Sequence, residues 1–106
     1  MYEFSKYDWK LYNQLLPKWQ EQYMQKLNLK YINILRSNNK ASTNFWTLEK
    51  QIKKDRKSPG VITEVTRSTM LWTLLDLIDE KVITAKDLVD FSEELKDAIN
   101  QIRQQN

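Results

Sequence analysis

Large apolar side chains recur at helical spacing along the first third of the chain. From Trp9 to Ile34 the intervals are three or four residues throughout, so these side chains share one face of a helix. Ser5 is a favourable N-cap for such a helix, and Asp8 suits the positive end of its dipole. The face comprises Trp9, Tyr12, Leu16, Trp19, Tyr23, Leu27, Tyr31 and Ile34.

Pro17 interrupts this pattern. A proline disfavours helical backbone at the preceding residue and removes one backbone donor. Either the helix kinks at Pro17, or the proline begins a second helix. Because the apolar face keeps its phase through the proline, we expect a short helix over 6–15 and a long one over 17–36, packed on the same side.

A polar turn over 37–40 separates these helices from the next apolar pattern. We expect a helix over 43–57, capped by Ser42 or Thr43. Its apolar face consists of Phe45, Leu48 and Ile52, with Trp46 beside it.

The only glycine, Gly60, directly follows Pro59 and marks the main internal boundary. Ser58 and Pro59 suit the N-cap and first position of a helix, which we expect over 59–80. Seven of the nine residues from 70 to 78 are apolar, Trp72 among them, so we place this helix at the centre of the fold. A strand over 61–66 is disfavoured because the residues do not alternate with a period of two.

Thr84 and Asp87 form an approximate capping box for a last helix over 84–104. About four residues join it to the helix over 59–80, so we expect the two to form an antiparallel hairpin. The predicted fold is therefore all-α: a compact bundle of four to five helices forming a single domain over 1–106.

The chain contains neither cysteine nor histidine. This excludes thiol nucleophiles, disulfides, Ser-His-Asp triads and metal sites with nitrogen or sulfur ligands. No stretch approaches the ~18 apolar residues of a membrane span. We expect a cytoplasmic protein that does not enter the membrane and binds no cofactor.

Carboxylates are the remaining catalytic candidates. One ridge on the last predicted helix flanks its apolar face, as a solvated surface would, and a second cluster lies between 76 and 80. Inward carboxylates from two helices could hold Mg²⁺ or Mn²⁺, but the chain has no paired Glu-x-x-Glu motifs, so we expect no enzyme. The two groups are Asp87, Asp90, Glu94 and Asp97, and Asp76, Asp79 and Glu80.

Charge is divided along the chain. Residues 1–60 carry 12 Lys/Arg and five Asp/Glu, whereas residues 61–106 carry five and nine. The basic half could dock an acidic partner, or the two halves could face each other within the fold or across a dimer. The basic side chains are densest near Trp46, in the candidate partner-binding set Trp46, Lys50, Lys53, Lys54, Arg56 and Lys57.

These basic residues also suit phosphate binding, with Trp46 stacking on a base. A helix-turn-helix interpretation fails, because the helix that would enter the groove carries Asp87, Asp90, Glu93 and Glu94. Ten of the 12 aromatic residues precede residue 47. Such a stripe is typical of a core, although its excess of tyrosine also suits a half-wet interface.

Two segments stand out: one runs from Phe45-Trp46 through Asp55-Arg56 and Pro59-Gly60-Val61 to Arg67-Ser68-x-Met70, and the other is Leu15-Leu16-Pro17-x-Trp19-Gln20. On these segments the chain resembles a family of small, uncharacterised helical proteins of Gram-positive bacteria, and the similarity covers most of the chain. The resemblance implies a bacterial cytoplasmic protein and carries no known activity.

The sequence thus favours a non-catalytic helical interaction or assembly module. Its expected partners are an unidentified protein and a second copy, with a dimer favoured. The alternative is a nucleic-acid-associated regulator that uses the basic segment 50–57.

Overall fold

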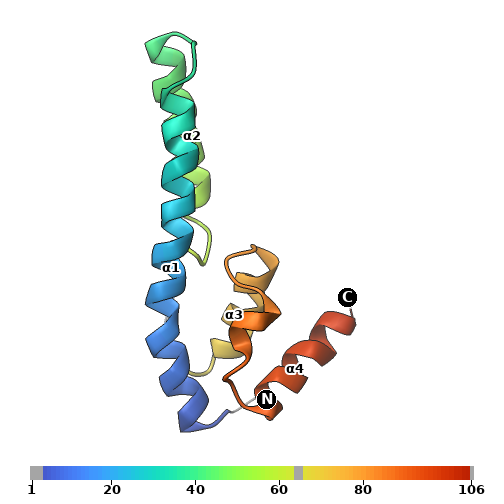
Figure 1. The fold of residues 1–106 in the computed structure, drawn as a ribbon. Coiled ribbons are helices and arrows are strands. Elements are labelled where there is room, and N and C mark those ends of the chain that lie inside the picture. Colours follow the sequence, from blue (N-terminus) through green and yellow to red (C-terminus); the bar gives the residue numbers. More distant parts are fainter. Residues whose placement is uncertain (1–3, 64–65, 106) are drawn as a thin grey trace.

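The computed structural model describes residues 4–63 and 66–105 (Figure 1). All regular structure in this part of the chain is helical, which confirms the all-α prediction. The elements are α1 (Lys6–Leu35), α2 (Ala41–Asp55), α3 (Met70–Asp79), the short 3-10 helix η1 (Ala85–Leu88) and α4 (Glu93–Gln104).

Helix α1 is continuous over 30 residues and passes through Pro17, so the expected division into helices over 6–15 and 17–36 is not observed. The helix begins at the predicted cap, where the Asp8 amide donates to Ser5 Oγ at 3.2 Å. Pro17 is exposed, whereas Leu16 and Trp19 are buried. Since the proline faces water, solvent can satisfy the carbonyl that loses its helical partner, while the buried neighbours hold the helix in place.

Helix α2 packs antiparallel to the second half of α1 after a tight turn (Figure 1). It begins at Ala41 rather than residue 43, and its N-cap is Lys40, which makes no side-chain capping bond. The predicted cap at Ser42 or Thr43 is therefore wrong. Instead Asn44 closes the turn, because it accepts from Ser37 Oγ at 2.7 Å and donates to the Ser37 carbonyl at 3.3 Å.

The third helix is shorter than the expected 59–80, because α3 begins only at Met70. Ser58 does not cap a helix; its Oγ accepts from the Gly60 amide at 3.1 Å within a buried turn. Gln20 of α1 donates to the Pro59 carbonyl at 3.0 Å and pins this turn to α1. Residues 64 and 65 of the expected helix lie outside the described residues.

Gly60 is required by packing rather than by backbone conformation. A Cβ atom at this position would lie 2.4 Å from Tyr23 Cδ2 and 2.7 Å from Val82 Cγ2. The turn after α2 can therefore approach both α1 and the segment after α3 only because residue 60 has no side chain.

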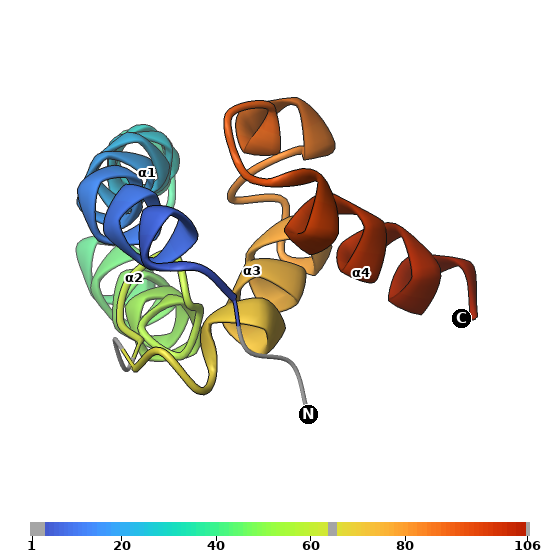
Figure 2. The ribbon, with the colours of Figure 1, turned by 90° about the horizontal axis from the view of Figure 1, so that it is seen from below.

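Helix α3 lies at the centre of the core, as predicted for this part of the chain (Figure 2). Met70, Leu74 and Leu77 are completely buried. They belong to one cluster that includes side chains of α1 and α4, among them Tyr12, Leu16, Trp19, Leu95 and Ile99. Trp72, expected on the packed face, is instead 52% exposed, because the core takes the positions on the other side of α3.

The predicted last helix over 84–104 is divided into η1 and α4. The capping box is confirmed, since the Thr84 amide donates to Asp87 Oδ2 at 2.8 Å. Ser92 then caps α4, where its Oγ accepts from the Leu95 amide at 3.2 Å.

Helices α3 and α4 do not form the expected antiparallel hairpin. Each begins near the start of α1: Arg67, just before α3, donates to the Phe4 carbonyl at 2.8 Å, and Ser92 bonds to Asp8. The segment after α3 returns along the helix, so both helices run in the same general direction (Figure 1).

Asp8 joins the beginnings of α1 and α4. Its carboxylate is fully buried and accepts from the Ser92 amide at 2.8 Å and from Ser92 Oγ at 2.6 Å. Nearby, Tyr7 Oη donates to the Asp90 carbonyl at 2.7 Å. A buried carboxylate is tolerated only when hydrogen-bond donors satisfy it. The contact between Asp8 and Ser92 therefore fixes where α4 starts.

The molecule is elongated rather than compact. Its radius of gyration is 16.7 Å, and its extents are 52 × 28 × 22 Å. A compact domain of this length would have a radius of about 13 Å. The core lies at one end, which we call the base, and the α1–α2 hairpin projects from it (Figure 1).

Asp8→Ala should lower the free energy of unfolding by about 3 kcal/mol, because two hydrogen bonds to a buried charged group are lost and the half-buried Ser92 donors are left without that partner. The exposed Asp90 of the same region provides the control, and Asp90→Ala should change stability by less than ~0.5 kcal/mol. Urea melts measure both, and equal effects would show that the Asp8–Ser92 pair does not hold the base.

Leu74→Ala should cost ~2–5 kcal/mol, since Leu74 is completely buried in the core. Trp72→Ala should cost only about 1 kcal/mol, because half of this side chain is already in water. The comparison uses thermal and urea unfolding, and a larger loss for Trp72→Ala would contradict the placement of the core.

Candidate interaction surface on the helical hairpin

The side of α2 that packs on α1 is polar. Asn44 is buried there, and Asp55 accepts from Tyr31 Oη of α1 at 2.7 Å and from Gln51 Nε2 at 3.0 Å. Desolvation, followed by the hydrogen bond and the negative charge of Asp55, raises the pKa of Tyr31 from 10.0 to about 12. Hydrogen bonds therefore hold much of the hairpin together.

The apolar face of α2 is left largely in solvent. Phe45 is 61% exposed and Ile52 40% exposed, although a helical face of this kind is normally packed. The second half of α1 adds three more exposed apolar side chains, Leu29, Ile32 and Leu35. The projecting hairpin thus exposes a concentration of apolar surface that the core of the base does not cover.

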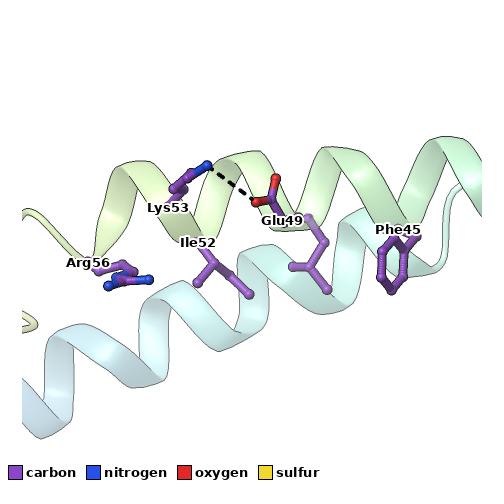
Figure 3. Close-up of a pocket in the computed structure, with 6 residues that line it drawn as sticks. Phe45, Glu49, Ile52, Lys53 and Arg56 are labelled. Atoms are coloured by element: carbon purple, nitrogen blue, oxygen red, sulfur yellow. Dashed lines mark ion pairs between the residues drawn. The ribbon is translucent and has the colours of Figure 1, made fainter.

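An open groove of about 270 Å³ runs along this face of α2. In Figure 3, Phe45 and Ile52 project from α2 toward the α1 ribbon, whereas Lys53 and Glu49 lie over α2 itself. The latter two form an ion pair with Lys53 Nζ 3.8 Å from Glu49 Oε1. The lining residues are Phe45, Leu48, Glu49, Ile52, Lys53 and Arg56.

The structure brings together five of the six candidate residues. Lys53 and Arg56 line the groove. Trp46 is 60% exposed and packs edge-on against Phe45, with ring centroids 4.9 Å apart and an interplanar angle of 87°. Spacings of four and three place Trp46, Lys50 and Lys53 in one row along α2, and Lys57 follows in the turn after the helix.

Lys54 is the exception among the candidates. Four residues after Lys50 on a continuous helix, it lies beside that lysine, on the side of the row that faces away from the groove. It is exposed and, like Lys50 and Lys57, it does not line the groove.

Exposed charge is segregated between the two ends of the molecule. Residues 21–57, which form the hairpin, carry nine Lys/Arg and three Asp/Glu, and all nine basic side chains are exposed. Residues 66–105 carry five Lys/Arg and eight Asp/Glu, and all eight acidic side chains are exposed. The ion pairs found among residues 4–63 and 66–105 are both local, Lys53–Glu49 and Lys96–Glu93, so none joins the two ends.

The carboxylate clusters do not converge. Within the described ranges, no group of three or more acidic side chains is placed to hold a metal ion. The same ranges contain no helix with the length and apolar character needed to cross a membrane.

The exposed residues Leu29, Ile32 and Leu35 were not identified from the sequence. They form a second apolar ridge with a spacing of three, beside the predicted face that includes Leu27 and Tyr31. One ridge is enough to pack a single neighbouring helix. Two apolar ridges in the same turns of one helix could therefore have predicted that one ridge stays exposed.

No family model, curated protein or solved structure matches this chain.

The Tyr31–Asp55 pair predicts a specific response to alkaline pH. Since the folded pKa of about 12 exceeds the unfolded value of 10.0, the stabilisation is complete below about pH 10 and is lost as the pH rises through 12. The near-ultraviolet tyrosinate absorbance of the wild type, minus that of Tyr31→Phe, should give a titration centred near 12. A difference curve centred near 10 would show that Asp55 does not hold the Tyr31 proton.

Proposed function

We propose that this chain is a non-catalytic helical interaction module that binds a protein through its hairpin. The binding surface, called here the hairpin face, combines the groove with the adjacent row of α2. Its partner is an acidic protein surface with apolar side chains among its carboxylates. The lack of cysteine agrees with the cytoplasmic location that we propose for the module.

The observation that carries this proposal is the exposure of large apolar side chains on a projecting element. Phe45 and Trp46 both have about 60% of their surface in water. Covering the exposed part of two such aromatic side chains would lower the free energy by several kcal/mol, at about 25 cal/mol per Å² of apolar surface removed from water. A patch of this kind on an otherwise charged element is typical of a protein-binding surface.

The charge around the apolar residues indicates the chemistry of the partner. Lys53 and Arg56 line the groove, Lys50 lies in the adjacent row and Lys57 in the turn after α2, whereas Glu49 is the one carboxylate among the residues that line the groove. Carboxylates of the partner would meet these cations at the rim, while its apolar side chains cover Phe45 and Ile52. Tryptophan and arginine, both present here, are enriched among residues that dominate binding energy.

Nucleic-acid binding is the second candidate, because Trp46, Lys50 and Lys53 share one row, with Lys57 in the turn that follows. A base could stack on Trp46 while the lysines contact phosphates. Protein binding is better supported, since phosphates would leave Phe45 and Ile52 uncovered, and since the other end of the molecule would repel a polyanion.

Fluorescence anisotropy distinguishes the two candidates. A labelled synthetic peptide, helical and amphipathic with leucines on one face and glutamates on the others, should bind at ~0.15 M salt, whereas mixed-sequence DNA should bind weakly or not at all. Phe45→Ala should weaken peptide binding at least tenfold. Val89→Ala, at an apolar position of the base with 67% exposure, is the control and should leave it unchanged.

Two results would contradict the proposal. Peptide binding that is insensitive to Phe45→Ala would show that the groove is not used. Absent peptide binding, together with DNA binding that falls steeply with salt and is abolished by Lys50→Glu and Lys53→Glu, would establish the nucleic-acid alternative.

A further inference from the structure

We infer that a second copy of this chain occupies the hairpin face, with the outer side of α3 as the surface that it presents. This inference rests on the proposed function, because it names the partner of the same surface. We call the outer side of α3 the acidic face; it comprises Trp72, Asp76, Asp79 and Glu80.

The acidic face follows from the way in which α3 packs. Met70, Leu74 and Leu77 are completely buried, so the opposite side of this helix faces water. Spacings of four and three place Trp72, Asp76 and Asp79 together on that side. Both aspartates are exposed, as is Glu80 at the end of the helix.

The two faces match in charge and in spacing. On α2, Lys50 and Lys53 are three residues apart, with Lys57 in the turn after the helix, and on α3 Asp76 and Asp79 are also three residues apart. Each such step is one helical turn, about 5.4 Å, so two helices lying side by side can pair several charges at once. Trp72, with 52% of its surface exposed, adds an aromatic ring to the carboxylates, as Phe45 and Trp46 do to the cations.

Other arrangements of the same surfaces are less favourable. Two hairpin faces brought together would oppose lysines with lysines, which is repulsive. A hairpin cannot fold back onto the acidic face of its own copy, because α1 is one unbroken helix anchored in the base. The acidic face of another copy is therefore the complementary surface that the molecule itself supplies.

An antiparallel pair of copies can use both faces of each molecule. The hairpin of one copy lies against α3 of its partner, and the partner's hairpin lies against α3 of the first. Such an arrangement is closed by a two-fold axis and gives a dimer.

The test is a reciprocal charge exchange in the full chain, measured by sedimentation velocity at micromolar concentration and ~0.15 M salt. The wild type should be dimeric and should dissociate near 1 M salt. The double variant Lys53→Glu with Lys57→Glu makes the hairpin face negative, so it repels the acidic face of the partner copy. The double variant Asp76→Lys with Asp79→Lys makes the acidic face positive, so it repels the hairpin face. Each double variant should be monomeric, with at least a tenfold weaker dimer.

Mixing the two double variants should restore the dimer, because both contacts then join opposite charges. Lys10→Glu with Lys18→Glu is the control, since it changes the net charge equally at exposed positions in the first half of α1. This control should stay dimeric. Circular dichroism verifies that every variant remains helical.

Two outcomes would overturn the inference. A wild type that is monomeric but binds the acidic peptide would exclude a second copy while leaving the proposed function intact; a monomer that binds no peptide would remove both. A dimer that survives both double variants, or that is not restored by mixing them, would show that these two faces do not form the contact.

Discussion

The buried carboxylate of Asp8 is the constraint on which the arrangement of the molecule depends. It lies in the first turn of α1 and accepts both hydrogen bonds from Ser92, the cap of α4, so two positive helix ends share one negative charge. The contact joins residues 84 positions apart and closes the base around α3. Because α1 is anchored at this end and continues unbroken for 30 residues, its second half must project away from the core.

The hairpin uses polar contacts between its helices while much of its apolar surface stays in water. Tyr31 and Asp55 form a half-buried hydrogen bond and Asn44 is buried, whereas Phe45 and Ile52 face water. Hydrogen bonds give a smaller net gain than apolar burial, about 1 kcal/mol each, so this arrangement is costly for a monomer. It becomes favourable if the outward apolar residues are covered by another protein. The polar interior and the proposed docking surface are thus two consequences of the same register of α2 on α1.

The sequence predicted the class of the fold well, because helical periodicity and capping are local properties. Ser5, the Thr84–Asp87 box and the central position of 70–79 were all identified correctly. Pro17 was misinterpreted, since its effect depends on which side of α1 faces water, and that is a tertiary property. The helix expected over 59–80 starts eleven residues late because Gly60 packs against Tyr23, a contact that local propensity does not contain. Trp46 and its basic neighbours were identifiable as a surface. The exposure of Phe45 and Ile52 could not be predicted in the same way. It depends on α2 packing on α1 through Asn44 and Asp55, and the sequence of α2 alone does not show which of its sides meets α1.

The separation along the chain between Asp8 and Ser92 also orders the events of biosynthesis. The α1–α2 hairpin consists of neighbouring segments and can form as soon as residue 55 has left the ribosome, since contacts that are local in sequence form fastest. The base cannot close until residue 92 and the following turn of α4 are available. During that interval Tyr12, Leu16 and Trp19 have no α4 against which to pack, and the nascent chain carries two apolar surfaces, one transient at the base and one lasting on the hairpin. A newly made chain is therefore more prone to association than the finished protein, and a slow pause in translation before residue 92 would prolong that state.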